Sequence, residues 1–109
     1  MAKSLDVVQG TLDLLILKAL SVESFHGWGI SARIQELSGN VFNIGQGSLY
    51  PALHRMEEAG WVKAEWVVTD NKRRARLYEI TVSGREQLDS QEARWRSVTL
   101  AVGQVLDSI

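Results

Sequence analysis

The chain has 109 residues, a net charge of −1, 45% hydrophobic and 23% charged side chains, and no cysteine. This length and composition are typical of one folded domain with one modest core, and they exclude an intrinsically disordered chain. The absence of cysteine excludes disulfides and thiolate metal sites, and it is compatible with a reducing cytoplasm, the location that we expect.

Three helices are predicted in the first sixty residues. Apolar side chains recur at the helical period over residues 11–21, with Thr11 as the expected N-cap. This apolar run is too short to span a bilayer and contains Asp13 and Lys18, so no membrane contact is expected. A second helix is predicted over residues 30–37, a short strand at 41–44, and a third helix over 49–59 that Gly60 closes.

Pro51, the single proline of the chain, lies near the start of the third predicted helix. With Ser48 as the N-cap, Pro51 falls in the first turn, where a missing N–H group removes no helical hydrogen bond. Winding the helix then places Leu49, Leu53 and Met56 toward the core. The outward N-terminal end offers polar, flat or cationic groups: Ser48, Tyr50, Pro51, His54 and Arg55.

Such groups suit a recognition helix, here residues 48–59, whose N-terminal turns enter the major groove of DNA. Taken alone, the segment also fits a solvated surface helix in which Arg55 pairs with Glu58. The next segment favours DNA binding. Residues 62–68 and 76–81 are predicted strands, and the loop and returning strand between them carry four of the twelve Lys and Arg side chains: Lys72, Arg73, Arg74 and Arg76.

A hairpin with such a basic end is typical of a wing, here residues 69–76, that contacts the DNA backbone or the minor groove. The alternative is a solvated loop whose charges protect a strand edge. Three compact helices followed by a hairpin predict an α+β winged helix-turn-helix domain, assigned to residues 1–81. The alternative function is a winged-helix interaction module that binds a partner protein or an anionic surface in place of DNA.

The last predicted helix, residues 82–109, begins after Thr81 and is too long for so small a domain to cover. Its seam repeats at alternating spacings of three and four residues: Leu88, Gln91, Trp95, Val98, Val102, Val105 and Ile109. We expect this helix to form a homodimer, the alternative being that it folds back on the first helix. Trp95, with Val98, is either a dimer-core residue or one wall of a site for a small aromatic effector.

Signatures of catalysis and of metal binding are missing from the sequence. There is no GxGxxG, GKS, GKT, GxSxG or HExxH motif, and the two histidines are His26 and His54. We therefore expect neither an enzyme nor a cofactor or metal site.

Four stretches carry a family resemblance, in order from about Gly10 to Gly84: GTLDLLILKAL, HGWGI, GSLYPALHRMEEAGWVKAEW and NKRRARLYEITVSG. They resemble the PadR family of bacterial transcriptional regulators, and the single final helix resembles the short branch of that family. The resemblance implies a homodimeric repressor that binds a pseudo-palindromic operator on double-stranded DNA. It also implies release by small molecules, which in parts of the family are phenolic acids or flat cationic drugs.

By position, the resemblance places Ser48, Tyr50 and His54 on the recognition helix and residues 72–74 on the wing. The chain departs from the family pattern at Trp28, where the HGYG motif more often has tyrosine.

Overall fold

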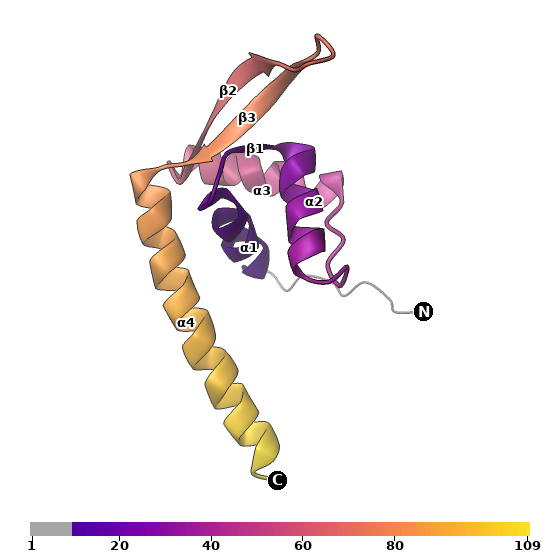
Figure 1. Cartoon of the computed structure of the whole chain (residues 1–109). Coiled ribbons are helices and arrows are strands. Elements are labelled where there is room, and N and C mark those ends of the chain that lie inside the picture. Colours follow the sequence, from indigo (N-terminus) through magenta and orange to yellow (C-terminus); the bar gives the residue numbers. More distant parts are fainter. Residues whose placement is uncertain (1–9) are drawn as a thin grey trace.

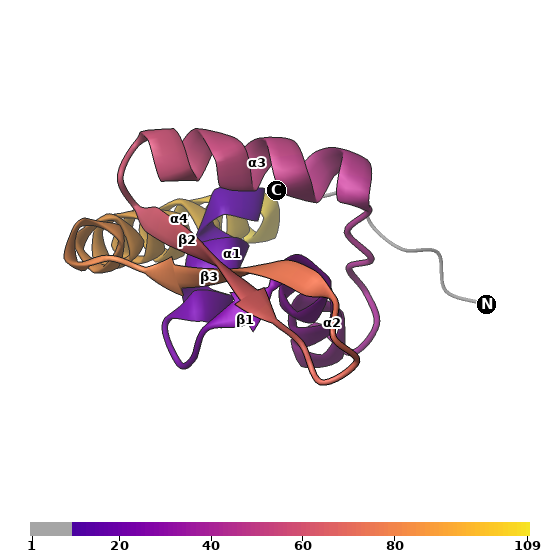
Figure 2. The same cartoon turned by 90° about the horizontal axis from the view of Figure 1, so that it is seen from above.

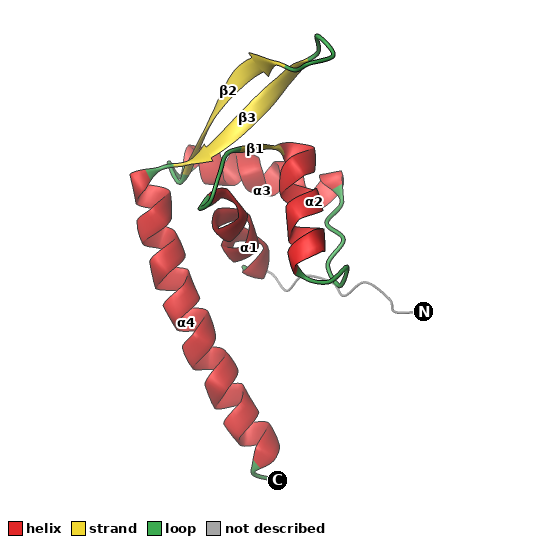
Figure 3. Ribbon diagram, in the orientation of Figure 1, coloured by secondary structure: helices red, strands yellow, loops and turns green. Residues whose placement is uncertain are grey.

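A computed structural model describes residues 10–109 (Figure 1), in which the elements follow the order α1 (Thr11–Leu20), β1 (Phe25–His26), α2 (Gly27–Leu37), α3 (Gln46–Glu58), β2 (Val62–Val68), β3 (Arg74–Ile80) and α4 (Val82–Asp107). Figure 3 shows the β2–β3 hairpin on one side of the three short helices and α4 extending away from them. The predicted α+β class, the winged helix-turn-helix arrangement and the long final helix are confirmed.

The sheet is antiparallel, with strand order β1-β3-β2. In the hairpin, the register runs from the pair Val62 and Ile80 to the pair Val68 and Arg74. β1 adds a short third strand, because Phe25 pairs with Tyr78. This strand was not predicted, since two residues are too few to show a period. It fastens the connection between α1 and α2 to the base of the wing.

The core is centred on α1. Ile16 and Leu17 are fully buried and Leu20 is 2% exposed, and α1 contacts α2, α3, α4 and β3. Leu49, Leu53 and Met56 of α3 are fully buried against it, as their predicted orientation requires. The apolar sides of α2 and α3 therefore pack on α1, the central helix.

The predicted start of α3 is wrong. Gly45, with extended backbone, is the N-cap, and its carbonyl accepts from the N–H groups of Ser48 at 3.1 Å and Leu49 at 3.0 Å. Ser48 therefore lies inside the first turn, and Pro51 lies inside the helix beyond that turn. Because proline has no N–H, the carbonyl of Gly47 has no hydrogen-bond donor four residues on. Gly45 and Gly47 give the start of this helix a low helix propensity, so the sequence does not predict its first turn.

Four other predicted boundaries are corrected. Residues 41–44 are not a strand, and Ile44 instead packs into the core. α2 begins at Gly27, after the extended backbone of His26. Gly10, not Thr11, is the N-cap of α1, and β3 begins at Arg74, two residues earlier than predicted.

Thr81 joins the wing to α4 and caps that helix, as predicted. Its hydroxyl accepts from the Gly84 N–H at 3.0 Å and donates to the Gly60 carbonyl at 2.6 Å. Its own N–H donates to the Trp61 carbonyl at 3.0 Å. A Cβ added to Gly84 would overlap that same Trp61 carbonyl oxygen. The first turn of α4 is therefore pressed against the start of β2.

Only the first half of α4 packs on α1. Leu88 is 5% exposed, Lys18 Nζ lies 3.2 Å from a Glu92 carboxylate oxygen, and Arg85 donates to the Ser21 carbonyl at 3.2 Å. The hydrogen bond from Lys18 lowers the pKa of Glu92 below its ordinary value. From Trp95 onward the apolar side chains are exposed. Among the helices of residues 10–109, none combines the length and the apolar character that a bilayer crossing requires.

The close approach at Gly84 predicts that Gly84→Ala destabilises the fold. The new methyl group must displace backbone, so we expect the free energy of unfolding to fall by about 1–3 kcal/mol, measured by urea denaturation. The matched control is Gly47→Ala, another helical glycine with no atom within 4 Å of an added Cβ. This control should leave stability unchanged or raise it slightly. Equal stability of Gly84→Ala and the unmodified protein would contradict this close packing of α4 on β2.

Candidate nucleic-acid interface

The outward face of α3 carries every residue predicted for it. Ser48, Tyr50, Pro51, His54 and Arg55 are all exposed. In Figure 2, α3 runs along one edge of the molecule and the loop between β2 and β3 lies at the opposite edge. Tyr50 of α3 and Arg74 of β3 nevertheless line one cavity. The fold therefore brings residues of the two predicted DNA-binding segments, far apart in sequence, to that cavity.

His54 projects freely from α3. Its Nε2 atom lies 3.1 Å from Glu58 Oε1, and the two side chains are 73% and 69% exposed. The pair is ionic only when His54 is protonated, and an exposed pair of this kind holds the imidazole weakly. The imidazole is therefore able to leave Glu58 and donate to, or accept from, another group.

Tyr50 lies between α3 and the start of α2. A Cβ on Gly27 would overlap the Tyr50 hydroxyl, so the glycine makes room for the ring. Beside it is a cavity of about 310 Å³ whose lining includes Gly27, Trp28, Tyr50, Trp66 and Arg74. Tyr50 is 39% exposed, so its ring both packs against α2 and borders the open surface.

Trp28 lies on the same surface, although no DNA-binding role is predicted for it from the sequence. Its ring stacks on His26 with 4.4 Å between ring centroids, and it is 56% exposed. Its departure from the HGYG pattern is the only signal in the sequence. An exposed indole at the start of α2 can donate one N–H toward a phosphate.

The wing loop is closed by its own backbone. The Thr69 N–H donates to the Arg73 carbonyl at 2.8 Å, and the Lys72 N–H donates to the Thr69 carbonyl at 2.9 Å. Lys72, Arg73 and Arg74 are exposed. Among residues 10–109, no carboxylate lies within ion-pair distance of these three cations. Arg74 lies over the Trp66 ring, 4.7 Å from its centroid.

Arg76 differs from the other wing cations. It is half-buried and bonds to the Glu57 carboxylate at 2.8 Å, so it ties β3 to the C-terminal part of α3. Its buried Nε has no partner among the described residues. Nearby, burial raises the pKa of Tyr78, an effect that the charge of Arg76 partly opposes. Arg76 therefore lies at the root of the wing.

Arg55 also has a structural partner. Its two terminal nitrogens donate to the two carboxylate oxygens of Asp13 on α1, at 2.6 and 3.0 Å. These hydrogen bonds raise the pKa of Arg55. Asp13 is only 8% exposed. The alternative pairing of Arg55 with Glu58 is wrong, because Glu58 pairs with His54.

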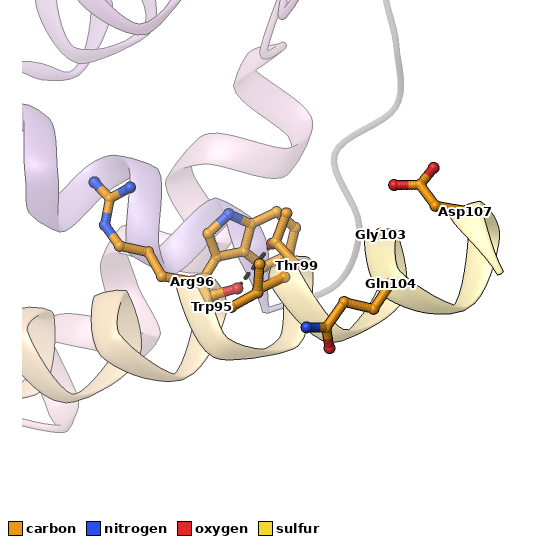
Figure 4. Close-up of a pocket in the computed structure, with 7 residues that line it drawn as sticks. Trp95, Arg96, Thr99, Gly103, Gln104 and Asp107 are labelled. Carbon is orange, nitrogen blue, oxygen red and sulfur yellow. Dashed lines mark hydrogen bonds between the residues drawn. The ribbon is translucent and has the colours of Figure 1, made fainter.

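The seam predicted on α4 is exposed within residues 10–109 beyond its first two positions, Leu88 and Gln91. Trp95 and Val98, the predicted effector residues, both line a cavity of about 420 Å³ between α1 and α4. A second hollow of about 570 Å³ runs along α4 from Trp95 to Asp107. Figure 4 shows the Trp95 ring standing off the helix, with the Thr99 hydroxyl donating to the Trp95 carbonyl at 2.7 Å.

Residues 10–109 contain no group of three or more His, Asp or Glu side chains placed to hold a metal ion.

Two curated bacterial proteins are similar to the chain. The transcriptional regulator Rv3488 of Mycobacterium tuberculosis is 43% identical over 54 residues, which are half of each protein. An uncharacterised protein X of Lysinibacillus sphaericus is 27% identical over 93 residues, 85% of each. The chain thus spans most of one relative and half of the other.

Solved structures share the whole fold. A transcriptional regulator from Clostridium thermocellum has a TM-score of 0.82 and 26% identity over 92% of this chain and 97% of its own. A PadR family regulator from Clostridium difficile has a TM-score of 0.76 and 26% identity over 89% and 99%. Bacillus subtilis PadR, solved in complex with operator DNA, has a TM-score of 0.67 and 22% identity over 73% and 45%, a likeness of fold alone.

The family match covers the parts of the chain that build the winged domain. The Transcriptional regulator PadR-like family matches residues 16–90, from the middle of α1 into α4. This span is more than half of the chain and includes α3 and the wing, so the chain belongs to the PadR-like family of transcriptional regulators.

Proposed function

We propose that this protein is a ligand-responsive repressor that binds a pseudo-palindromic operator on double-stranded DNA as a homodimer. Residues 1–81 would form the DNA-binding domain and residues 82–109 the dimerisation helix. The observation that carries the proposal is a group of wing cations, Lys72, Arg73 and Arg74, without acidic partners among residues 10–109. Arg74 lines the same cavity as Tyr50 at the exposed end of α3. Such a regulator acts where the chromosome is, which in a bacterium is the cytoplasm.

The charges on this surface favour a polyanion as the partner. Lys72, Arg73 and Arg74 repel one another in the free protein, and a phosphate backbone would remove that repulsion. Exposed loop cations of this kind bind phosphates more readily than they distinguish bases. The wing is thus expected to supply affinity, on the backbone or in the minor groove.

The exposed end of α3 is the part suited to base recognition. Ser48 and His54 carry groups that donate and accept hydrogen bonds, as the base edges of the major groove require. Tyr50 and Pro51 supply flat and apolar surface next to them. Bacillus subtilis PadR binds operator DNA, and the shared winged fold supports a corresponding orientation here, with α3 in the major groove.

The apolar seam of α4 supports a homodimer. Val98, Val102 and Val105 are about half exposed or more, and Ile109 is fully exposed. An apolar row of this length on a single helix is stabilised when a second copy covers it. A twofold pair would present two α3 helices, which accounts for a pseudo-palindromic operator.

Trp95 and Val98 are proposed to contact the effector. The cavity that they line lies between α1 and α4. A flat aromatic molecule placed there would stack on the indole and contact apolar groups. The effector would then lie between the dimerisation helix and the central helix of the DNA-binding domain.

Removing the two cations at the wing tip tests phosphate binding. Lys72→Ala combined with Arg73→Ala should weaken binding to duplex DNA of any sequence and flatten its salt dependence, by about 0.9 in the log–log slope for each phosphate that is no longer neutralised. Fluorescence anisotropy over a series of salt concentrations measures this. The control is Lys63→Ala. This exposed lysine and its partner Glu79 both lie at the end of the hairpin away from the tip. An unchanged slope in the double variant would remove the wing from the interface.

Replacing His54 tests base recognition. We expect His54→Ala to reduce discrimination between operator and random DNA by about 1–3 kcal/mol, with little change in binding to random DNA. The comparison variant is Glu58→Gln, which keeps the imidazole, removes a nearby negative charge, and should bind equally or more tightly. Equal losses on operator and random DNA in His54→Ala would exclude base recognition by this residue.

Placing a charge on the seam tests the dimer. Val102→Glu should convert the protein to monomers, because a buried carboxylate pair would repel and lose hydration. Sedimentation equilibrium measures the state, and operator binding should weaken in parallel. Ala93→Glu, on the side of α4 away from the seam, is the control and should remain dimeric. A wild-type protein that is monomeric at micromolar concentrations would refute the proposed assembly.

A further inference from the structure

We propose that Asp13 and Arg55 form a positioning pair, which fixes the orientation of α3 on α1 and thereby sets how the exposed end of α3 meets DNA. Arg55 then acts through Asp13 and is not itself a DNA contact, contrary to its place among the predicted contacts. This inference rests on the proposed function, and it assigns a role to Asp13, the one charged residue that is buried among residues 10–109.

The geometry of the pair restrains rotation as well as distance. Each of the two guanidinium nitrogens donates to a separate carboxylate oxygen, at 2.6 and 3.0 Å. Two parallel hydrogen bonds hold the planes of both groups, whereas a single bond would act as a pivot. Lysine cannot reproduce this fork, because its ammonium group is a single point of charge.

The two partners lie on different helices, Asp13 on α1 and Arg55 on α3. Asp13 belongs to α1, whose next turn carries the fully buried Ile16 and Leu17. The carboxylate is thus fixed to the centre of the core. Arg55 lies directly between the exposed His54 and the fully buried Met56 on α3. Holding the Arg55 side chain therefore fixes the rotation of α3 next to His54.

Stability alone does not account for this pair. A buried carboxylate loses hydration, and the attraction to its partner often does no more than offset that loss. Apolar side chains of similar volume often stabilise such a place equally well or better. What an apolar pair lacks is direction, because dispersion contacts allow sliding that two hydrogen bonds forbid.

The pair also weakens Arg55 as a phosphate ligand. Two of its five N–H groups donate to Asp13, and although the Arg55 side chain is 59% exposed, the carboxylate offsets the charge that a phosphate would seek. Arg73 at the wing tip has no such partner among residues 10–109. The two arginines are thus expected to respond differently to mutation, which makes the inference testable.

The experiment compares Asp13→Asn, Arg55→Gln, the combination of both, and Arg55→Lys. The probes are a duplex containing the DNA upstream of the protein's own gene, or the best duplex selected from a random pool, and a random duplex of the same length. Anisotropy titrations over several salt concentrations give the affinity ratio and the salt slope. Arg96→Gln, which breaks an exposed pair with Glu92 on α4, is the control and should behave as wild type.

For a positioning pair, each single variant should lose about tenfold in the ratio of specific to random binding, and the combination should lose no more than either single variant. The salt slope on random DNA should stay unchanged. Arg55→Lys should be impaired like Arg55→Gln, because charge without the fork does not restore the orientation.

A direct phosphate contact would give the opposite pattern and overturn the proposal. Arg55→Gln would then weaken binding to both duplexes alike and lower the salt slope, Arg55→Lys would restore both, and Asp13→Asn would free Arg55 and bind equally or more tightly. Wild-type behaviour of all four variants would overturn it too. If the wild-type protein binds neither duplex, the proposed function fails and takes this inference with it.

Loss of folding is separated from loss of positioning by an apolar pair. Asp13→Leu combined with Arg55→Leu replaces the buried charge with apolar side chains, so the domain should remain folded by circular dichroism and thermal denaturation. A positioning role requires this folded variant to discriminate as poorly as Asp13→Asn. Wild-type discrimination by the Leu–Leu variant would show that the pair serves stability alone.

Discussion

The packing of α1 on several sides at once is the constraint on which the rest of the molecule depends. One ten-residue helix contacts α2, α3, β3 and the first half of α4, so each of these elements is placed by reference to it. Its Ile16 and Leu17 are fully buried in the core that also contains the apolar side chains of α2 and α3. Because interiors are close-packed, a shift of α1 is passed to its neighbours. α1 thus positions the other elements while its own apolar side chains are buried or half-buried.

The basic side chains of α3 and the wing fall into two groups with different physical roles. Arg55 and Arg76 bond to carboxylates on neighbouring elements, Asp13 and Glu57, and so hold the framework together. Lys72 and Arg73 lie at the tip of the wing without such partners among residues 10–109, and Arg74 lies over Trp66. Net charge conceals this division, since a value of −1 averages paired and unpaired cations together. Among the basic side chains of α3 and the wing, those without an acidic partner in residues 10–109 are thus all on the wing.

Much of the fold could be predicted from the sequence because its long elements have strong periodicity. The orientation of α3 followed from Leu49, Leu53 and Met56, and the cap of α4 from Thr81. Short elements and glycine-rich starts could not be predicted, since β1 has two residues and the first turn of α3 contains Gly47. Partners in space were also hidden. No local pattern connects Asp13 with Arg55, 42 residues away, and the i to i+3 spacing favoured Glu58 instead.

The direct passage from β3 through Thr81 into α4 makes the last helix a lever. With 26 residues at 1.5 Å each, α4 is about 39 Å long. A rotation of about 5° at Thr81 would therefore move its far end by about 3 Å, by the same rise per residue. Thr81 also bonds to Gly60 and Trp61, the residues just before β2. The start of α4 is therefore connected to both strands of the hairpin. A displacement of the exposed half of α4 that tilted the whole helix would therefore reach the hairpin through Thr81.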